Sequence, residues 1–397
     1  MLKAIVNTKL VMRDGIIWDG ALVMRDDTIV DVGWRKDVNI PEGAEILDAE
    51  GLYTAPGLVD LHNHGCPKWL FAEEPIECAK YFLLHGVTTV LPTFYHAISK
   101  EGMVEAAAKI RALSKTGVGK VMKEGLYMEG PFMSLMGSFQ NQIKWSGDIR
   151  EEDYVDLIDA FGDMVRVWAI DPGRVGIENF MAYAKEHTPR AVFAHGHSRS
   201  TFEDIEALKH YGVRIRTHIT DAGQAKGRAQ GTPGAGGDQF ALYDPDIYAE
   251  LICDETGIHV PPGLIKLIAR TKGVERICLI SDHMTAGGDG TVKYKNNEEL
   301  GVWYGSDLNY DDQGKLAGSM MTLDNGVRNM MTHTGYGLCH AIRMATYNPA
   351  EAVHIEDKVG SLQRGKRANL ILIDDAVHIK KVILEGELAV EDGKILL

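Results

Sequence analysis

The chain has 397 residues, of which 45% are hydrophobic and 25% are charged, so it is long enough to bury a large core. Its formal net charge of −14 argues against nucleic acid or an anionic membrane surface as the main partner, because both require a basic protein face. A local basic pocket can still bind a small phosphorylated metabolite. No run approaches the roughly 20 apolar residues of a membrane span, and the start lacks the apolar core of a signal peptide. The five cysteines are scattered without a Cys-x-x-Cys pair, which is typical of reduced thiols, so we expect a cytoplasmic protein.

Both ends of the chain consist of short apolar runs separated by turn residues, a pattern typical of β-strands. The strand-like runs are Lys3–Val6, Leu10–Met12, Ala21–Arg25, Thr28–Val32, Ala44–Asp48, Asn369–Ile373, His378–Glu385 and Glu387–Val390. Because the middle of the chain has a different pattern, we expect the two ends to pair with each other. The prediction is a small β-sandwich domain split in sequence, made from residues 1–55 and 356–397.

Residues 56–355 alternate between strand-like and helical segments, which predicts a parallel sheet. After a first strand that ends near residue 62, the predicted strands are Gly86–Thr93, Gly125–Met128, Arg166–Ile170, Ala191–Ala194, Val213–Thr217, Gly257–Val260 and Arg276–Ser281. Predicted helices include Pro75–His85, Lys100–Ser114, Asp153–Phe161 and one that Ser200 opens, with Glu203 at capping-box spacing. The number of strands and the length predict an α/β fold of the (β/α)₈ TIM-barrel type.

Two histidines close the first predicted strand, which runs into His62-Asn63-His64 after the turn residues Pro56-Gly57. Side chains at positions i and i+2 of a strand point to the same side. His62 and His64 are therefore predicted to project two imidazoles into one space, an arrangement that suits a divalent metal ion.

Further histidine and acidic residues follow other strands, at the end of a barrel where functional groups lie. They are Glu129 after the third strand, His195 and His197 after the fifth, His218 after the sixth and Asp282 after the eighth. Imidazole nitrogens and carboxylate oxygens are the ligands of catalytic zinc and iron sites. The pattern predicts a site for one or two divalent ions, zinc or iron.

The chemistry of these groups suggests a role for each. Glu129 can bridge two cations or bind one, and His197 and His218 would hold one ion with it. His62 and His64 would hold a second ion or complete the first. A bound metal lowers the pKa of a water molecule toward neutrality. Asp282 is the candidate general base and then acid, or a metal ligand, and these two roles are compatible.

These residues lie in motifs that resemble a known family. The segment Pro56–Gly65 is similar to the opening motif of the amidohydrolase superfamily. Further segments, over nearly the whole chain, resemble the N-acetylglucosamine-6-phosphate deacetylases: Glu129–Phe132, Gly196–Ser198, Thr217-His218, Gly257–Val260, Ser281-Asp282, Leu316–Ser319, Ala345–Ala350 and Gly360–Leu370.

The resemblance implies a metal-dependent barrel that hydrolyses an acetamide on a sugar, in a homodimer. It implies that Glu129, His197 and His218 are the principal metal ligands, that Asp282 is the catalytic acid and base, and that His62 and His64 match a variant with a second metal. His259 matches a histidine that contacts substrate and helps to polarise the scissile carbonyl. The other positions that match substrate-binding segments are Asp221, Ala222, Arg228 and Ser319.

The chain departs from the family where the substrate is bound. Met136–Gln140 stands near the place of a Lys-Gly-Ala-His segment, and Asp221 replaces an asparagine. Gly227–Gly234 replaces the loop that binds phosphate; its Arg228 can still meet an anion, whereas Asp221 opposes one. We therefore expect an acylated amino sugar as the small-molecule substrate, foremost N-acetylglucosamine 6-phosphate. The alternative substrates are an unphosphorylated N-acetyl sugar, an N-acyl-D-amino acid or a cyclic amide. A non-catalytic scaffold is a less favoured alternative, because no candidate metal ligand is missing from the sequence.

Overall fold

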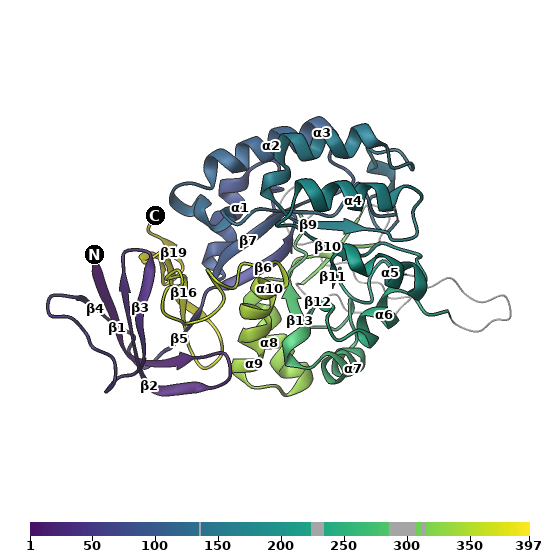
Figure 1. The fold of residues 1–397 in the computed structure, drawn as a ribbon. Coiled ribbons are helices and arrows are strands. Elements are labelled where there is room, and N and C mark those ends of the chain that lie inside the picture. The colour runs from purple at the N-terminus through teal and green to yellow at the C-terminus, as the bar shows by residue number, and fades with distance from the viewer. Residues whose placement is uncertain (135, 224–233, 286–306, 312–314) are drawn as a thin grey trace.

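Eight parallel strands form a barrel in the computed structural model, which describes residues 1–134, 136–223, 234–285, 307–311 and 315–397. Each strand pairs with the next along the chain, in the order β6 to β13 (Figure 1). The strands are β6 (Leu58–Asn63), β7 (Val87–Phe94), β8 (Leu126–Met128), β9 (Val165–Ile170), β10 (Val192–His195), β11 (Val213–Arg216), β12 (Tyr248–Ile252) and β13 (Ile277–Ile280). The predicted (β/α)₈ barrel is confirmed.

The composition of the strands explains their position. Every residue of β7 and β9 is buried, as expected for parallel strands that are covered on both faces and rich in apolar and β-branched residues. The ring closes between the eighth and first strands just beyond the strand ends. There the Asp282 N–H donates to the His62 carbonyl (2.9 Å), and the His64 N–H donates to the His283 carbonyl (3.0 Å). These two bonds bring opposite ends of the barrel sequence together at the site.

Helices cover the outside of the barrel (Figure 1). They are α1 (Pro75–Leu84), α2 (Lys100–Leu113), α3 (Glu151–Phe161), α4 (Ile177–His187), α5 (Phe202–Leu208), α6 (Gly237–Tyr243), α7 (Pro262–Lys272), α8 (Leu323–Thr334), α9 (Leu338–Met344) and α10 (Tyr347–Ala352). Short 3₁₀ turns lie at Gly117–Met122, Gln140–Gln142, Gly162–Met164, Lys209–Tyr211 and Val274–Arg276. In α7, Ile265, Ile268, Ala269 and Lys272 are buried at helical spacing against the barrel.

The start of α5 differs by one residue from the prediction. Thr201, not Ser200, caps the helix, and it forms a capping box with Asp204 in place of Glu203. The Ser200 hydroxyl is already engaged, because it accepts from the Gly173 N–H at 2.8 Å. A local pattern cannot show that a neighbouring loop competes for the capping hydroxyl.

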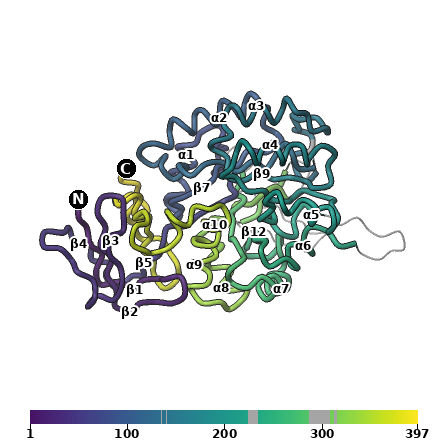
Figure 2. Tube along the Cα trace, viewed as in Figure 1, coloured from purple at the N-terminus to yellow at the C-terminus, as the bar shows by residue number. Residues whose placement is uncertain are grey.

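A second sheet of nine strands takes strands from both chain ends, as predicted. Its strands are β1 (Leu2–Val11), β2 (Ile16–Arg25), β3 (Thr28–Trp34), β4 (Glu45–Asp48), β5 (Tyr53–Pro56), β16 (Leu370–Ile373), β17 (Ile379–Leu384), β18 (Glu387–Glu391) and β19 (Lys394–Ile395). The ends join where β5 pairs antiparallel with β16. The two runs predicted within residues 3–12 are one strand, β1, whose pairing with β2 shifts register between them. Figure 2 shows both termini on this sheet.

The predicted seventh barrel strand at Gly257–Val260 is wrong. The seventh strand is β12, and residues 257–260 belong to the loop that follows it. Glu250 lies in the middle of β12 and interrupts an otherwise apolar run, so the segment does not look like a buried strand in sequence. The loop nevertheless carries His259 to the same end of the barrel.

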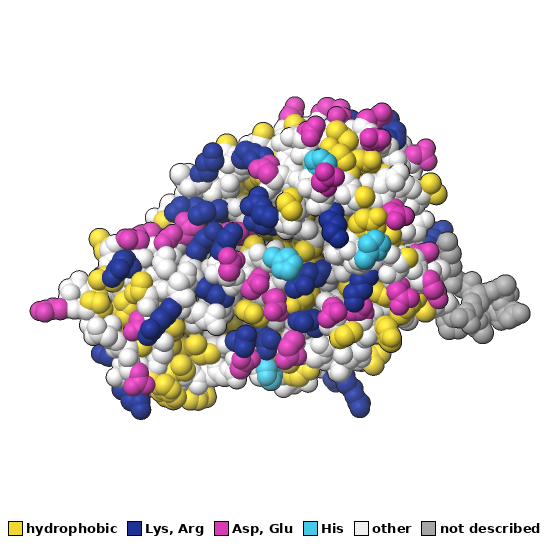
Figure 3. Space-filling model, viewed as in Figure 1, with side chains coloured by type: hydrophobic (Ala, Val, Ile, Leu, Met, Phe, Trp, Pro, Cys, Tyr) yellow, Lys and Arg dark blue, Asp and Glu magenta, His cyan; other side chains and the backbone are white. Residues whose placement is uncertain are grey.

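A small antiparallel pair, β14 (Leu308–Tyr310) and β15 (Leu316–Ser319), lies beside the eighth strand end, where His283 bridges Ser319. Among the described residues, no helix has both the length and the apolar character to cross a bilayer. On the face drawn in Figure 3, Lys and Arg side chains are interspersed with Asp and Glu side chains.

Candidate active site

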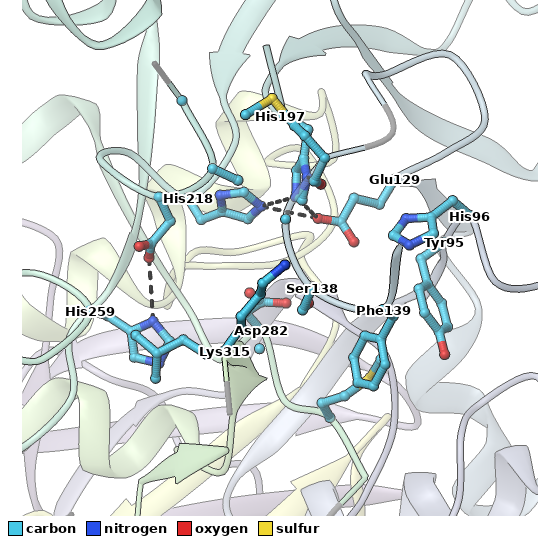
Figure 4. A pocket seen from close by; sticks show the side chains of 18 of the residues that line it. Tyr95, His96, Glu129, Ser138, Phe139, His197, His218, His259, Asp282 and Lys315 are labelled. Carbon is cyan, nitrogen blue, oxygen red and sulfur yellow. Dashed lines mark hydrogen bonds and ion pairs between the residues drawn. The ribbon is translucent and has the colours of Figure 1, made fainter. Parts of the chain in front are cut away.

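A pocket of about 490 Å³ opens at the carboxyl ends of the barrel strands. Its walls include Glu129, His197, His218 and Asp282, which follow the third, fifth, sixth and eighth strands. Figure 4 shows Glu129, His197 and His218 pointing toward one another, with Asp282 and His259 nearby in the pocket. The barrel thus brings together side chains that are far apart in sequence, because parallel strands end at the same rim.

The first group of candidate ligands is Glu129 with two histidines. Glu129 Oε1 lies 3.2 Å from His197 Nε2 and 3.0 Å from His218 Nε2, and the two nitrogens are 3.1 Å apart. The other ring nitrogen of His197 lies 2.7 Å from the Met136 carbonyl and donates to it. This hydrogen bond leaves Nε2 with the lone pair that a metal needs.

The second group consists of His62, His64 and Asp282. His64 Nε2 lies 3.2 Å from Asp282 Oδ1 and 3.0 Å from Glu129 Oε2. His62 Nε2 lies 3.6 Å from Asp282 Oδ1 and 3.4 Å from Glu129 Oε1. The two histidines therefore face the same space, and Glu129 lies between the two groups, with one oxygen near each of them.

The geometry of both groups fits a divalent metal ion. Ligand atoms that surround a tetrahedral zinc at about 2 Å lie about 3.3 Å from one another. Within each group the candidate ligand atoms all lie within 4.8 Å of one another, and every one of the six residues is buried. His62 Nε2 is a buried nitrogen without a hydrogen-bond partner among the described residues, which is costly unless something binds it.

Buried opposite charges set the protonation of the cluster. Burial raises the pKa of Glu129, but the charges of His62 and His64 and the contacts with His197 and His218 outweigh burial and hold it well below its ordinary value. Burial lowers the pKa of His64, whereas Glu129 and Asp282 raise it to about 9 in the metal-free protein. Protons on His62 and His64 thus balance the carboxylates, and a bound cation would take over that role.

Three of these residues also have an unusual backbone. His197, His218 and Asp282 have φ angles of 41°, 25° and 46°, in or near the left-handed region that residues other than glycine rarely adopt. Each such conformation costs on the order of 1–3 kcal/mol and clusters at functional sites. The fold thus holds three candidate ligands in conformations that the isolated chain would not favour.

The sequence-predicted substrate residues lie at different depths. His259, Asp221 and Ala222 line the pocket. His259 Nδ1 lies 3.3 Å from a carboxylate oxygen of Asp221. Burial lowers the pKa of His259, but Asp221 raises it above its ordinary value. Ser319 is fully buried behind Asp282, where its N–H donates to the Asp282 carbonyl (2.7 Å). Arg228 lies outside the described residues.

Two further histidines beside the sequence motifs, His195 and His283, do not line this pocket. His195, at the end of β10, is buried against Phe240, and burial and the charge of Arg216 hold its pKa well below the ordinary value. His283 is fully buried beside Tyr81 and Phe82, and burial lowers its pKa to about 3. His283 contributes through its backbone, which joins the first and eighth strand ends.

Sequence reasoning missed several residues of the site. Tyr95 and His96 line the pocket directly after β7, so the rule that found the other strand ends would have found them. Arg199 and Lys315 also line it, next to the motifs that end at Ser198 and begin at Leu316. Glu250 was missed because its strand was not recognised.

Comparison with known proteins places these residues in a family. Residues 53–389 match the model described as the amidohydrolase family. The chain is 25% identical to an N-acetylglucosamine-6-phosphate deacetylase of Haemophilus influenzae, over 98% of this chain and 99% of that protein. It is 27% identical to an N-acetylgalactosamine-6-phosphate deacetylase of a Shewanella species, over 76% of this chain and 73% of that one.

A similar solved structure is that of N-acetylglucosamine-6-phosphate deacetylase from Pasteurella multocida, with a TM-score of 0.82 and 26% identity, covering 98% of this chain and 99% of that one. The matched family model spans most of the chain, and its barrel carries the two groups of metal-ligand side chains. The chain therefore belongs to the amidohydrolase family and is a metal-dependent hydrolase of carbon–nitrogen bonds in linear amides.

Proposed function

We propose that this protein deacetylates N-acetylglucosamine 6-phosphate, producing glucosamine 6-phosphate and acetate. The observation that carries the proposal is the convergence of Glu129, His197 and His218 with His62, His64 and Asp282 at one end of a barrel whose relatives are sugar-phosphate deacetylases. We further propose that the enzyme is a homodimer, as the resemblance implies, and that it is cytoplasmic, as its scattered cysteines indicate.

Two sets of residues would hold the metal. Glu129, His197 and His218 would bind one cation, and His62, His64 and Asp282 would bind a second, with zinc or iron as the ion. When bound, a divalent cation here supplies Lewis-acid chemistry that acidifies a water molecule and polarises the amide carbonyl.

Asp282 moves the proton in this mechanism. Its carboxylate lies at the end of the eighth strand, lines the pocket and is 3.2 Å from His64. Burial raises the pKa of Asp282, but His62 and His64 lower it below the ordinary value, so the carboxylate is ionised and able to accept a proton from water. Asp282 then returns that proton to the amine nitrogen as the carbon–nitrogen bond breaks.

His259 is placed to polarise the amide oxygen. The Asp221 carboxylate accepts a hydrogen bond from Nδ1 and, by raising the pKa of the ring, favours the imidazolium form. Nε2–H of that form is a donor for the oxygen that becomes negative as water adds to the carbonyl. Asp221 and Ala222 would contact the sugar on the same side of the pocket.

Arg199 and Lys315 would bind the phosphate together with Arg228, which lies outside the described residues. Both side chains line the pocket, and neither forms an ion pair with the described residues. Figure 4 shows the Lys315 side chain pointing into the pocket. Arginine and lysine are the usual partners of phosphate oxygens. These cations offset the acidic Asp221, which would otherwise oppose an anion.

A panel of substrates tests the proposal. Acetate release by the metal-loaded enzyme is measured with N-acetylglucosamine 6-phosphate, N-acetylgalactosamine 6-phosphate, N-acetylglucosamine and an N-acetyl-D-amino acid. We expect the highest kcat/KM with N-acetylglucosamine 6-phosphate. A preference for the galactosamine compound would reassign the sugar. Equal rates with the unphosphorylated sugar would show that the enzyme does not recognise the phosphate. No release from any of them would reject the deacetylase assignment.

A further inference from the structure

Glu250 is a fully buried carboxylate that lies against both groups of candidate metal ligands. It comes from the middle of β12, and its side chain and that of His62 are both 0% exposed. One oxygen, Oε2, lies 3.2 Å from His62 Nδ1, 3.3 Å from the backbone N–H of His218 and 3.4 Å from the Tyr127 hydroxyl. A single buried oxygen thus contacts a ligand of one group and the backbone of a ligand of the other.

The contact determines which nitrogen of His62 carries a hydrogen. Glu250 Oε2 already accepts from the backbone N–H of His218, so it acts as an acceptor, and His62 Nδ1 donates to it. Nε2 is then the atom that faces the pocket cluster, at 3.4 Å from Glu129 Oε1 and 3.6 Å from Asp282 Oδ1. Nε2 is buried and makes no hydrogen bond to a described residue. Nε2 is therefore the nitrogen that a cation would bind in place of a proton.

The acceptor behind His62 differs from the one behind His197. His197 donates to a neutral backbone carbonyl, that of Met136, whereas His62 donates to a carboxylate. A carboxylate behind an imidazole fixes the ring orientation and makes its other nitrogen a stronger metal ligand. The chain therefore places a carboxylate behind a histidine of the second group.

We infer that Glu250 is a positioning residue that commits His62 to bind a divalent cation through Nε2, together with His64 and Asp282. The inference rests on the proposed function only in that the site holds metal. The competing role is purely structural: Glu250 would stabilise a charged His62 in a buried ion-pair network, and a single ion would bind at Glu129, His197 and His218.

Metal stoichiometry distinguishes the two roles without using substrate. The full-length protein is stripped with a chelator, titrated with Zn²⁺ and analysed by elemental analysis after gel filtration. Titration with Co²⁺, followed through the visible absorption of the bound ion, gives the affinity of each equivalent. The variants are Glu250→Ala, the isosteric Glu250→Gln and Tyr127→Phe. The last removes the hydroxyl that contacts the same carboxylate oxygen and leaves His62 untouched.

We expect the wild type and Tyr127→Phe to bind two ions. Glu250→Ala should bind the first ion normally and the second about 10–100-fold more weakly, the usual cost of losing the group behind a ligating histidine. Glu250→Gln keeps an acceptor oxygen without the charge, so its second ion should be weakened by about 10-fold.

Three results would overturn the inference. They are a wild type that binds one ion, a Glu250→Gln variant that binds both ions with wild-type affinity, and an equal loss of both ions in Glu250→Gln. If Glu250→Ala does not fold, Glu250→Gln still decides the question. A protein that binds two ions but releases no acetate would reject the proposed function and leave this inference intact.

Discussion

Asp282 has the backbone conformation, the charge and the position in the pocket that suit a residue that transfers a proton. Its φ of 46° turns the chain out of β13, and its carboxylate lines the pocket beside His64. The amide of Asp282→Asn has nearly the same shape but cannot accept the proton, so we expect kcat to fall by about 10²–10⁴-fold.

Steady-state acetate release checks this prediction, with metal content measured in parallel. The ion at Glu129, His197 and His218 should remain, because Asp282 is not in that group. A variant with kcat within threefold of the wild type would show that another group transfers the proton.

Two single substitutions in the pocket wall test whether its basic side chains bind the phosphate of the substrate. Arg199→Gln and Lys315→Gln remove positive charge from the pocket wall without altering the candidate metal ligands. Losing a charge-assisted hydrogen bond costs on the order of 1.5–3 kcal/mol, so each variant should raise KM for the phosphorylated sugar by about 10-fold or more. The kcat/KM for unphosphorylated N-acetylglucosamine should not change.

Arg270→Gln is the matched control, since Arg270 is an exposed cation on α7 that does not line the pocket. It should leave both KM values at wild-type levels. If the two pocket variants weaken the phosphorylated and unphosphorylated sugars equally, Arg199 and Lys315 do not bind the phosphate.

At the scale of elements, strands that are short apolar runs could be predicted from the sequence. The prediction failed for a buried strand that carries an acidic residue. Every barrel strand except β12 was located, because Gly, Pro and polar residues flank them. Glu250 made β12 look polar, yet its Oε2 contacts His62 and Tyr127, which come from other strands. Such partners are contacts between distant segments, which no local pattern contains.

The same limit applies to the site. The histidines and acids at strand ends were visible because the barrel rule places them at one rim. The burial of Ser319 behind Asp282 and the competition for the Ser200 hydroxyl were not visible, because both depend on how neighbouring loops pack. Distances within the cluster likewise required the structure.

Helix α8 offers a stability test away from the active site. Asp324 in its first turn accepts from Arg328 (2.7 Å) and lies 3.2 Å from His85 at the end of α1. Burial raises the pKa of Asp324, but His85 and Arg328 outweigh burial and lower it to about 2. A lowered folded pKa stabilises the protein above the ordinary pKa of about 3.8 and loses that contribution as pH falls toward 2.

Asp324→Asn should therefore lower the free energy of unfolding by about 2 kcal/mol at pH 7, and the difference should shrink between pH 4 and pH 2. Urea denaturation at several pH values measures it. Asp156→Asn, which changes an exposed carboxylate on α3, should change stability by less than about 0.5 kcal/mol. A difference for Asp324→Asn that is constant with pH would contradict the predicted ionisation.

At the scale of the whole molecule, the two chain ends form one sheet, and the barrel begins directly after the N-terminal part of that sheet in sequence. Residues 53–56 of β5 pair with residues 370–373 of β16, and β6 begins two residues after β5 ends. We propose that residues 1–55 and 356–397 form one unit and residues 56–355 the other. The pairing of the ends was predictable from their shared strand pattern, whereas the order of the nine strands was not.

The central claim is that this barrel hydrolyses an acetamide with bound metal and Asp282. The most direct measurement is acetate release from N-acetylglucosamine 6-phosphate by three samples: purified enzyme, chelator-stripped enzyme shown to be metal-free, and stripped enzyme with Zn²⁺ restored. We predict activity in the first, none in the second and recovery in the third, and no recovery in Asp282→Asn. Full activity in the metal-free sample, or in metal-loaded Asp282→Asn, would contradict the account.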